Sequence, residues 1–382
     1  MSQNCDFLVI GAGMAGASVA YHLAEQGRVL VLEQEPQPGY HSTGRSAALY
    51  SETYGNAAIR ALTTGSGPFY RNPPDGFVEY PLIQPRGVYW IAREDQLDTL
   101  QKTYDEIQKL CSTLRKLGPA EAFERVPVLR PDYVAGVVEE PDAQDLDVDG
   151  IHQGFLRGLR QRGGSVLTEA EVQSGAFQDG VWSIEAESGR YTTPVVVNAA
   201  GAWGDVVAKR CGIAPVGLVP KRRTAMLFSP PEGLSSRNWP LFVDVDEQFY
   251  VKPEVEHLLG SPADETPSEP CDARPEDWDL AVAAERIGQA TTLEIERISR
   301  KWAGLRTFAA DKTPVVGYAP GHEGFFWLVG QGGYGIQTAP ALSRTAAALV
   351  LGHPVPDDLS AFGVRAEVLS PERFRVRTQN PR

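Results

Sequence analysis

Short apolar runs recur along the chain, separated by stretches whose apolar positions follow a helical period. The first run, Phe7–Ile10, precedes a glycine-rich turn, a helix-like stretch and a second apolar run, Val29–Leu32. Pro194–Asn198 is a further continuous run, typical of a strand buried on both faces of a parallel sheet. These patterns predict an α/β fold with a strand–turn–helix–strand unit at its start.

The same reading places the other elements. We expect helices at residues 55–73, 95–117, 148–162, 278–291 and 336–351, and a short helix within 41–50. We expect strands at 87–92, 223–228, 248–251, 296–308 and 325–329, and a solvated loop rich in proline and acidic residues at 261–277. Helices and strands are interleaved throughout, so the chain does not divide into two consecutive domains.

The first turn has the spacing of a dinucleotide-binding site. Gly11 permits the tight turn, Gly13 lets the backbone approach a pyrophosphate, and Gly16 lets the helix lie close to the strand. The helix N-terminus offers N–H groups and a partial positive charge to phosphates. Glu33, 22 positions after Gly11, ends the second strand, where an acid can bind the ribose hydroxyls of adenosine. A chance glycine turn in a buried βα unit is the alternative to a dinucleotide site.

A second glycine-rich turn follows the apolar run Phe325–Val329. Residues 330–335 contain four glycines and lead into a helix, which repeats the logic of the first turn. A helix N-terminus here can face another electron-rich part of a cofactor, such as the ring edge of a flavin. The run Pro194–Asn198 also ends in small residues, through Trp203, that let the backbone turn beside a ligand.

Composition narrows the function classes. The formal net charge of −13 argues against nucleic acid or an anionic membrane as the main partner, since both select basic surfaces. No basic segment precedes the apolar stretch 7–20, and glycines interrupt it, so neither a signal peptide nor a membrane span is indicated. We expect a cytoplasmic location, with peripheral contact to a membrane where electron transfer requires it.

No metal site is indicated. The cysteines Cys5, Cys111, Cys211 and Cys271 form no CxxC pair, and we interpret them as isolated thiols. The acids at 145–149 match the start of a calcium-binding loop, but its twelfth position is Leu156, where a bidentate Glu is needed. We interpret these acids as the start of a helix.

Several segments together resemble the glycine oxidase/D-amino-acid oxidase family of FAD enzymes, in particular its D-amino-acid and D-arginine dehydrogenases. They are VIGAGMAG, GYHSTGRSAALY, VVNAAGAW, the KRR at 221–223, the KWAGLR at 301–306 and GQGGYGIQT. The likeness extends over nearly the whole chain. It implies a Rossmann-like FAD-binding domain interleaved with a sheet-based (α+β) substrate domain. The implied segments are 1–86, 141–217 and 305–382 for the first, and 87–140 and 218–304 for the second.

The resemblance also implies functional residues. Residues that would contact a non-covalently held FAD are Gly11, Gly13, Ala15, Gly16, Glu33, Gln34, Ser42, Thr43, Gly44, Arg45, Ser46, Ala47, Ala48, Val172, Gly332, Gly333, Tyr334, Gly335, Ile336 and Gln337. Residues that would contact the substrate are Leu49, Tyr54, Val88, Arg223, Tyr250, Arg306 and Gly333, with Tyr54 and Tyr250 as the catalytic pair. Covalent relatives attach flavin through a cysteine, but Cys211 and Cys271 lie away from the flavin motifs.

The chemistry suits these residue types. An arginine fork clamps a carboxylate with two charge-assisted bonds and so orients the Cα–H of an amino acid toward the flavin. Tyrosine hydroxyls add donors without adding charge. Without the resemblance, Arg223 would be interpreted as a surface charge, and Tyr54 and Tyr250 as packing aromatics.

The expected reaction is oxidative deamination of D-amino acids: hydride transfer from Cα to the flavin, then hydrolysis of the imino acid to a 2-oxo acid and ammonia. A quinone or another carrier would re-oxidise the flavin. The D-arginine enzyme has an acid and a histidine where this chain has Val88 and Leu49, so we expect a preference for neutral, mostly hydrophobic side chains, unless another acid such as Glu52 compensates. Oxidation of a secondary amine or 2-hydroxy acid, and a non-catalytic assembly role, are the alternatives.

Overall fold

The computed structural model describes residues 3–375. Its centre is a six-stranded sheet in which the first predicted unit lies at the middle. The strand order is β10 (Ser165–Leu167), β3 (Val29–Leu32), β2 (Phe7–Ile10), β14 (Val195–Asn198), β22 (Phe325–Val329) and β21 (Val315–Tyr318). All neighbours are parallel except β21, which runs antiparallel to β22. The Rossmann-like α/β fold is confirmed.

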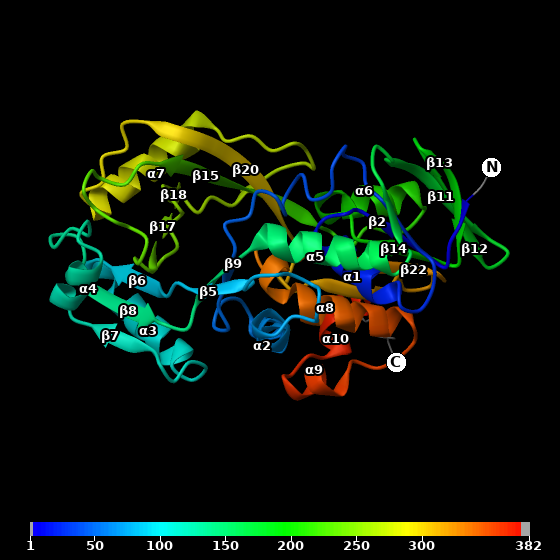
Figure 1. Ribbon diagram of the computed structural model, residues 1–382, viewed down its shortest axis with the longest axis horizontal. Coiled ribbons are helices and arrows are strands. Elements are labelled where there is room, and N and C mark those ends of the chain that lie inside the picture. Colours follow the sequence, from blue (N-terminus) through cyan, green and yellow to red (C-terminus); the bar gives the residue numbers. More distant parts are fainter. Residues whose placement is uncertain (1–2, 376–382) are drawn as a thin grey trace, which may run out of the picture.

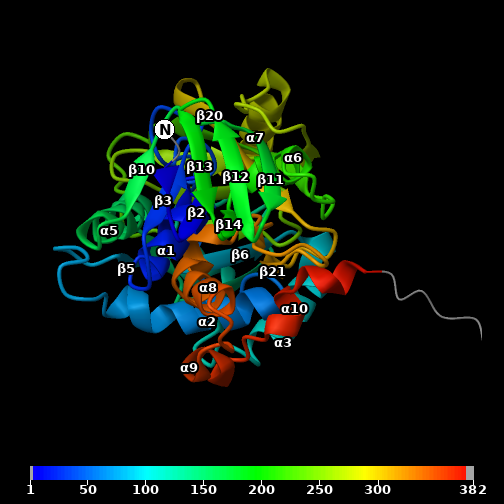
Figure 2. The same ribbon diagram turned by 90° about the vertical axis from the view of Figure 1, so that its right-hand side faces the viewer.

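Both faces of this sheet are covered, which explains its continuous apolar runs. Val9 and Val31 face a helical layer made of α1 (Met14–Leu23), α2 (Ala57–Arg71), α5 (Val148–Gln161) and α8 (Gly335–Val350). Leu8 and Leu30 face the opposite layer. That layer contains α6 (Gly204–Arg210) and a second sheet with the order β1 (Gln3–Asn4), β13 (Gly189–Thr193), β12 (Val181–Ala186) and β11 (Val172–Gln178) (Figure 2).

A larger antiparallel-rich sheet lies beside this body (Figure 1). Its order is β19 (Thr266–Pro267), β15 (Val219–Phe228), β18 (Leu258–Ser261), β17 (Tyr250–Pro253), β16 (Leu241–Asp244), β6 (Val88–Ala92), β8 (Gly136–Glu140) and β7 (Arg115–Leu117), and β20 (Ile298–Phe308) pairs with β15. Its helices are α3 (Leu97–Ile107), α4 (Pro119–Arg125) and α7 (Asp277–Ala290). The proposed domain boundaries remain a prediction.

The remaining elements are short. A three-stranded sheet joins β4 (Leu49–Tyr50), β9 (Gln144–Leu146) and β5 (Ile83–Pro85). The 3₁₀ turns are η1 (Glu94–Gln96), η2 (Gly201–Trp203) and η3 (Pro371–Phe374), and the last α-helices are α9 (Asp357–Ala361) and α10 (Ala366–Leu369). Asp147 caps α5 by accepting a hydrogen bond from the Gly150 N–H at 2.8 Å, and Asp149 lies in its first turn, which confirms the interpretation for these two acids. Asp145 instead lies on β9 and pairs with Arg86 at 2.6 Å.

One predicted helix is wrong, and another is shorter than predicted. Residues 41–50 form turns that lead into β4, because Ser42 and Arg45 bond to distant backbone carbonyls instead of forming a local helix. The helix predicted at 95–117 ends at Ile107, and Arg115–Leu117 is strand β7. Arg115 forms an ion pair with the buried Glu139 of the neighbouring strand, a tertiary interaction that overrides the helical pattern.

Candidate active site

The turn before α1 has contacts that require glycine. Gly11 has φ of +98°, and a Cβ there would lie 2.7 Å from the carbonyl oxygen of Ala199. A Cβ on Gly16 would lie 1.8 Å from the carbonyl oxygen of Gly11, so this glycine lets the helix approach the strand, as predicted. Gly11, Gly13 and Ala15 line a cavity that we call the long cavity. The N-terminus of α1 points into it. Its N–H groups and dipole suit a phosphate.

Glu33 lies at one end of this long cavity, together with Gln34 and Val172. Its carboxylate accepts hydrogen bonds from the backbone N–H groups of Ala12 at 2.7 Å and Glu35 at 3.0 Å. Burial raises the pKa of Glu33, whereas these hydrogen bonds lower it. The bonds fix the carboxylate, and its remaining lone pairs can accept from a ribose diol.

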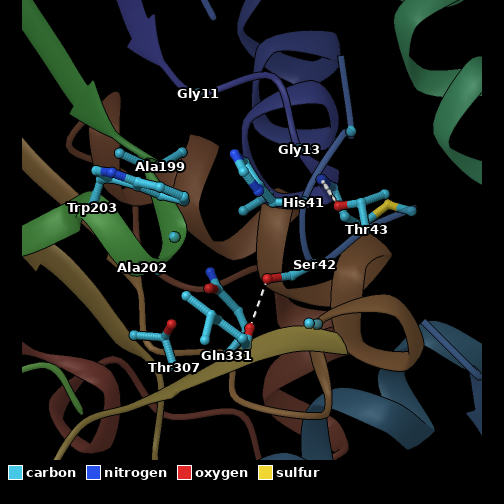
Figure 3. A pocket seen from close by; sticks show the side chains of 18 of the residues that line it. Gly11, Gly13, His41, Ser42, Thr43, Ala199, Ala202, Trp203, Thr307 and Gln331 are labelled. Carbon is cyan, nitrogen blue, oxygen red and sulfur yellow. Dashed lines mark hydrogen bonds between the residues drawn. The ribbon is translucent and has the colours of Figure 1, made fainter. Parts of the chain in front are cut away.

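The segment between β3 and β4 borders the long cavity and is tied to two distant elements (Figure 3). The Thr43 hydroxyl accepts a hydrogen bond from the Met14 N–H at 2.9 Å, and the Ser42 hydroxyl donates to the carbonyl oxygen of Leu305 at 2.6 Å. These bonds join α1 and β20 through one loop. Ser46 and Ala47 also line the cavity.

Arg45 lines the same cavity, but its guanidinium is held by the protein. It donates to the carbonyl oxygens of Ala273 at 2.9 Å and Ala303 at 3.0 Å, and it forms an ion pair with Asp272. The structure therefore gives Arg45 a positioning role for the loop.

Ala199 and η2 line the cavity beside this loop, and Figure 3 shows them near His41. The His41 and Trp203 rings lie 4.6 Å apart, and His41 bonds the Glu35 carboxylate at 2.8 Å. The sequence indicated a turn beside a ligand here but identified neither His41 nor Trp203 as lining residues. No motif marks them, because their proximity depends on the loop path.

The far end of the long cavity lies between β20 and the start of α8. The Thr307 hydroxyl is buried there without a hydrogen-bond partner, and Gln331 lines the cavity beside it (Figure 3). Gly335 and Ile336 bring the N-terminus of α8 to the same surface. An orphaned buried hydroxyl is costly unless a ligand pairs with it. The long cavity thus fits a dinucleotide whose phosphates meet α1 and whose polar ring edge meets α8.

A second, smaller cavity adjoins the long one. Six residues line both: Ser46, Ala47, Arg223, Tyr250, Arg306 and Gly333. The Arg223 side chain is nearly buried and donates through Nε to the carbonyl oxygen of Asp264 at 2.8 Å. Burial, and then the like charge of Arg306, lower the pKa of Arg223. Arg223 lies 3.6 Å from the Glu265 carboxylate, whereas Arg306 has no ion-pair partner within residues 3–375, so the two cations at this junction are only partly compensated.

The predicted tyrosines lie at the same place. Tyr54 and Tyr250 both line the smaller cavity. Burial raises the pKa of Tyr54, while the neighbouring Arg306 lowers it, so its hydroxyl stays a neutral donor near pH 7. The Tyr54 ring packs against Tyr334 with centroids 5.0 Å apart. The structure thus brings together the arginines and tyrosines that the sequence pointed to.

The rest of the smaller cavity is mostly apolar. Leu49 and Val88 line it, as do Leu241 and Val243, which sequence reasoning missed. Ala48 and Gln337 also line it, and Gln337 donates to the Thr63 hydroxyl at 2.9 Å. Ser51, Trp90, Glu140 and Glu247 are the missed lining residues with polar side chains. They could have been found only from the pairing of the strands.

Three predicted residues line neither cavity. Gly16 packs α1 against β2, and the Gly44 N–H closes its loop by donating to the carbonyl oxygen of Gly39 at 2.8 Å. The Tyr334 ring packs against the ring of Tyr54. The suggested compensating acid Glu52 binds Tyr50 at 2.6 Å and Arg71 at 2.9 Å and does not line either cavity.

Residues 3–375 contain neither a membrane-spanning helix nor a metal-binding cluster. No helix among them is both long and apolar enough to cross a bilayer. No cluster of three or more His, Cys, Asp or Glu side chains in this range could hold a metal ion.

The fold and the two joined cavities define a dinucleotide-dependent oxidoreductase. Residues 6–349 match the family model described as FAD dependent oxidoreductase, DAO, so the chain belongs to this family. Its cofactor is therefore FAD, and the predicted family is confirmed. Assignment to the D-arginine dehydrogenases within it remains a prediction.

Similar proteins cover nearly the whole chain. Glycine oxidase of Bacillus licheniformis is 24% identical over 387 residues, covering 95% of this chain and 97% of that protein. L-proline dehydrogenase from P. horikoshii superposes with a TM-score of 0.82 at 20% identity, covering 98% of each chain. L-amino acid deaminase from Proteus vulgaris has a TM-score of 0.81 at 17% identity, again covering 98% of each. The two structural likenesses concern the fold alone.

Proposed function

We propose that this chain is an FAD-dependent dehydrogenase of D-amino acids that favours neutral, largely apolar side chains. The observation that carries the proposal is the junction of the two cavities, where Arg223 and Arg306 lie together and Arg306 has no ion-pair partner within residues 3–375. Two such cations favour an anionic ligand, and the α-carboxylate of an amino acid matches a guanidinium fork.

The chain's own residues would bind and orient the substrate. Arg306 and Arg223 would hold the carboxylate, and the Tyr54 and Tyr250 hydroxyls would add neutral hydrogen bonds at the same end. Because that end adjoins the long cavity, Cα would be placed at the boundary between the cavities. FAD, when bound, accepts the two electrons and the hydrogen that Cα loses. The amino group releases a proton, and water hydrolyses the resulting imino acid to a 2-oxo acid and ammonia.

The walls of the smaller cavity support the side-chain preference. Leu49, Val88, Leu241 and Val243 present hydrocarbon, and burying an apolar side chain against them contributes about 25 cal/mol per Å². A charged side chain packed against these four residues would lose its hydration, although Glu140 and Glu247 also line the cavity. The proposed preference for D-enantiomers rests on the arginines and tyrosines that match the D-amino-acid dehydrogenases. The similar proteins named above give it no support, because their names concern glycine or L-substrates.

Anaerobic bleaching of the bound flavin tests the proposal. The purified holoenzyme is mixed with D- and L-leucine, D- and L-methionine, sarcosine and D- and L-lactate, and absorbance of oxidised flavin is followed. The proposal expects rapid bleaching by the D-amino acids alone. Bleaching by sarcosine or lactate instead would assign a secondary amine or a 2-hydroxy acid, and bleaching by L-enantiomers only would refute the stereochemistry. No bleaching by any compound would favour the non-catalytic alternative.

For re-oxidation we propose a quinone or another carrier in place of oxygen. Steady-state turnover with a soluble quinone analogue should exceed oxygen consumption in the same buffer by a wide margin. Oxygen consumption that matches quinone reduction would make the chain an oxidase.

A further inference from the structure

The smaller cavity ends in a buried carboxyl group that the mechanism above does not use. Glu140 is the last residue of β8, is 2% exposed, and lines this cavity. Its register partner on the neighbouring strand β6 (Figure 1) is Val88. Val88 lines the same cavity, so the two side chains share one face of the sheet. An acid at this place faces the substrate, not the core.

The partners of Glu140 are neutral hydroxyls. Ser51 donates to one carboxyl oxygen at 2.8 Å and Thr53 to the other at 2.9 Å, and both residues are buried. Within the described range 3–375, no lysine, arginine or histidine lies within ion-pair distance of Glu140. The adjacent Glu139 shows the contrast, because it faces the other side of the strand and pairs with Arg115 and Arg125. Burial raises the pKa of Glu140, and the hydroxyl bonds lower it.

A buried donor lies next to this carboxyl. The Trp90 indole N–H is buried without a hydrogen bond of ordinary geometry, and it lies close enough to the Glu140 carboxyl to act as a donor that lowers its pKa. Buried polar groups are rarely left unpaired in a native structure. The cavity therefore offers lone pairs on Glu140 and the nearby Trp90 N–H, among apolar residues together with Ser51 and Glu247.

Glu140 and Arg223 lie on different strands of the large sheet, although both line the smaller cavity. In the sheet order β15-β18-β17-β16-β6-β8, Arg223 is on the first of these strands and Glu140 on the last. Leu241 and Val243 of β16 lie between them and line the cavity. A substrate anchored by its carboxylate would direct its side chain along these apolar residues toward Glu140.

We infer that Glu140, with Trp90, selects amino acids whose side chain ends in a neutral group that both donates and accepts hydrogen bonds, such as a carboxamide. This inference rests on the proposed function, because it takes the arginine junction as the carboxylate site, and it narrows the preferred neutral side chains from wholly apolar ones to those with an apolar stem and an amide tip. A carboxamide N–H can donate to Glu140 while its oxygen accepts from the Trp90 N–H. An ammonium has three donors and a guanidinium five, and the two hydroxyl-bonded oxygens of Glu140 cannot satisfy them among hydrocarbon neighbours.

Isosteric substrate pairs test the inference. The pairs are D-asparagine with D-leucine and D-glutamine with D-homoleucine. Each pair is compared by kcat/KM with an artificial acceptor. A third pair, D-lysine with D-norleucine, tests a cationic side-chain end. In the wild-type holoenzyme, the amide should exceed its hydrocarbon isostere by about tenfold for at least one pair. Glu140→Leu should bring that ratio to one or below. The matched control Glu139→Gln should leave it unchanged.

Two further variants separate selection from structural support. Glu140→Gln keeps an acceptor at the site and should retain most of the ratio of kcat/KM between amide and isostere. Trp90→Phe should lower that ratio several-fold, and it tests the inference independently if Glu140→Leu does not fold. Equal losses on both members of each pair would show that Glu140 only supports the loop carrying Ser51 and Thr53.

Other outcomes overturn the inference directly. One is a ratio of kcat/KM between amide and isostere that is near one in the wild type. The other is a preference for D-lysine over D-norleucine that Glu140→Leu abolishes, because Glu140 would then be a counter-ion. Failure of every amino acid to reduce the flavin would instead overturn the proposed function.

Discussion

Replacing Arg306 by methionine removes the charge that the proposed reaction depends on most. The Arg306 guanidinium faces both cavities and has no ion-pair partner within residues 3–375, so its bonding capacity is available to a ligand. Two charge-assisted hydrogen bonds of about 1.5–3 kcal/mol each would be lost, partly offset by the remaining clamp. We therefore expect a loss of about 3 kcal/mol or more, which is roughly 150-fold or more in kcat/KM.

The assay is steady-state turnover of the best D-amino acid with an artificial acceptor, after flavin content has been confirmed by absorbance. Arg223→Met should give a loss of similar size. It should also lower stability, because Arg223 donates to the Asp264 carbonyl oxygen. Arg300→Met is the control, since Arg300 lies on the same strand β20 but is exposed and packs over Trp302. Near-normal kcat/KM in Arg306→Met, or an equal loss on a decarboxylated amine, would refute the carboxylate role.

Three other results are expected. Acid precipitation should release yellow FAD into the supernatant, because Cys211 and Cys271 line neither cavity; flavin retained in the pellet would show a covalent bond. Glu33→Ala should weaken FAD binding by about tenfold or more in a titration of the apoprotein, and unchanged affinity would contradict a ribose contact. Burial, with the charges of Arg344 and Arg162, lowers the pKa of His22 to about 3. Stability should then be fully present above about pH 6.5 and fall as the pH drops toward 3, because only the unfolded chain takes up the proton there. His22→Gln should flatten this dependence in urea unfolding, whereas exposed His322→Gln should not.

Local patterns sufficed for the cofactor half of the molecule. Gly16 and Glu33 act through contacts within one βαβ unit, and Gly11 supplies the positive φ of its turn, so their spacing alone revealed the fold of that unit. The helix predicted at 41–50 failed because Ser42 and Arg45 bond to β20 and to Ala273, more than two hundred residues later in the chain. Long-range bonds of this kind leave no local signal.

The substrate half shows the same limit. Arg223, Arg306, Tyr54 and Tyr250 were found by resemblance, and the structure places all four at one cavity. Glu140 was missed, because its exposure to the cavity follows from the pairing of β8 with β6, which no run of residues announces. The suggested acid Glu52 is only two residues from Tyr54 in sequence, yet it pairs with Arg71 outside the cavity.

The central claim is that this chain breaks the Cα–H bond of a D-amino acid. The most direct measurement is the rate of anaerobic flavin bleaching in stopped flow, with D-leucine and with D-leucine deuterated at Cα. The account predicts that bleaching occurs with D-leucine, that deuteration slows it several-fold, and that L-leucine gives none. Bleaching by L-leucine alone, or no bleaching by D-amino acids in a protein loaded with FAD, would contradict it.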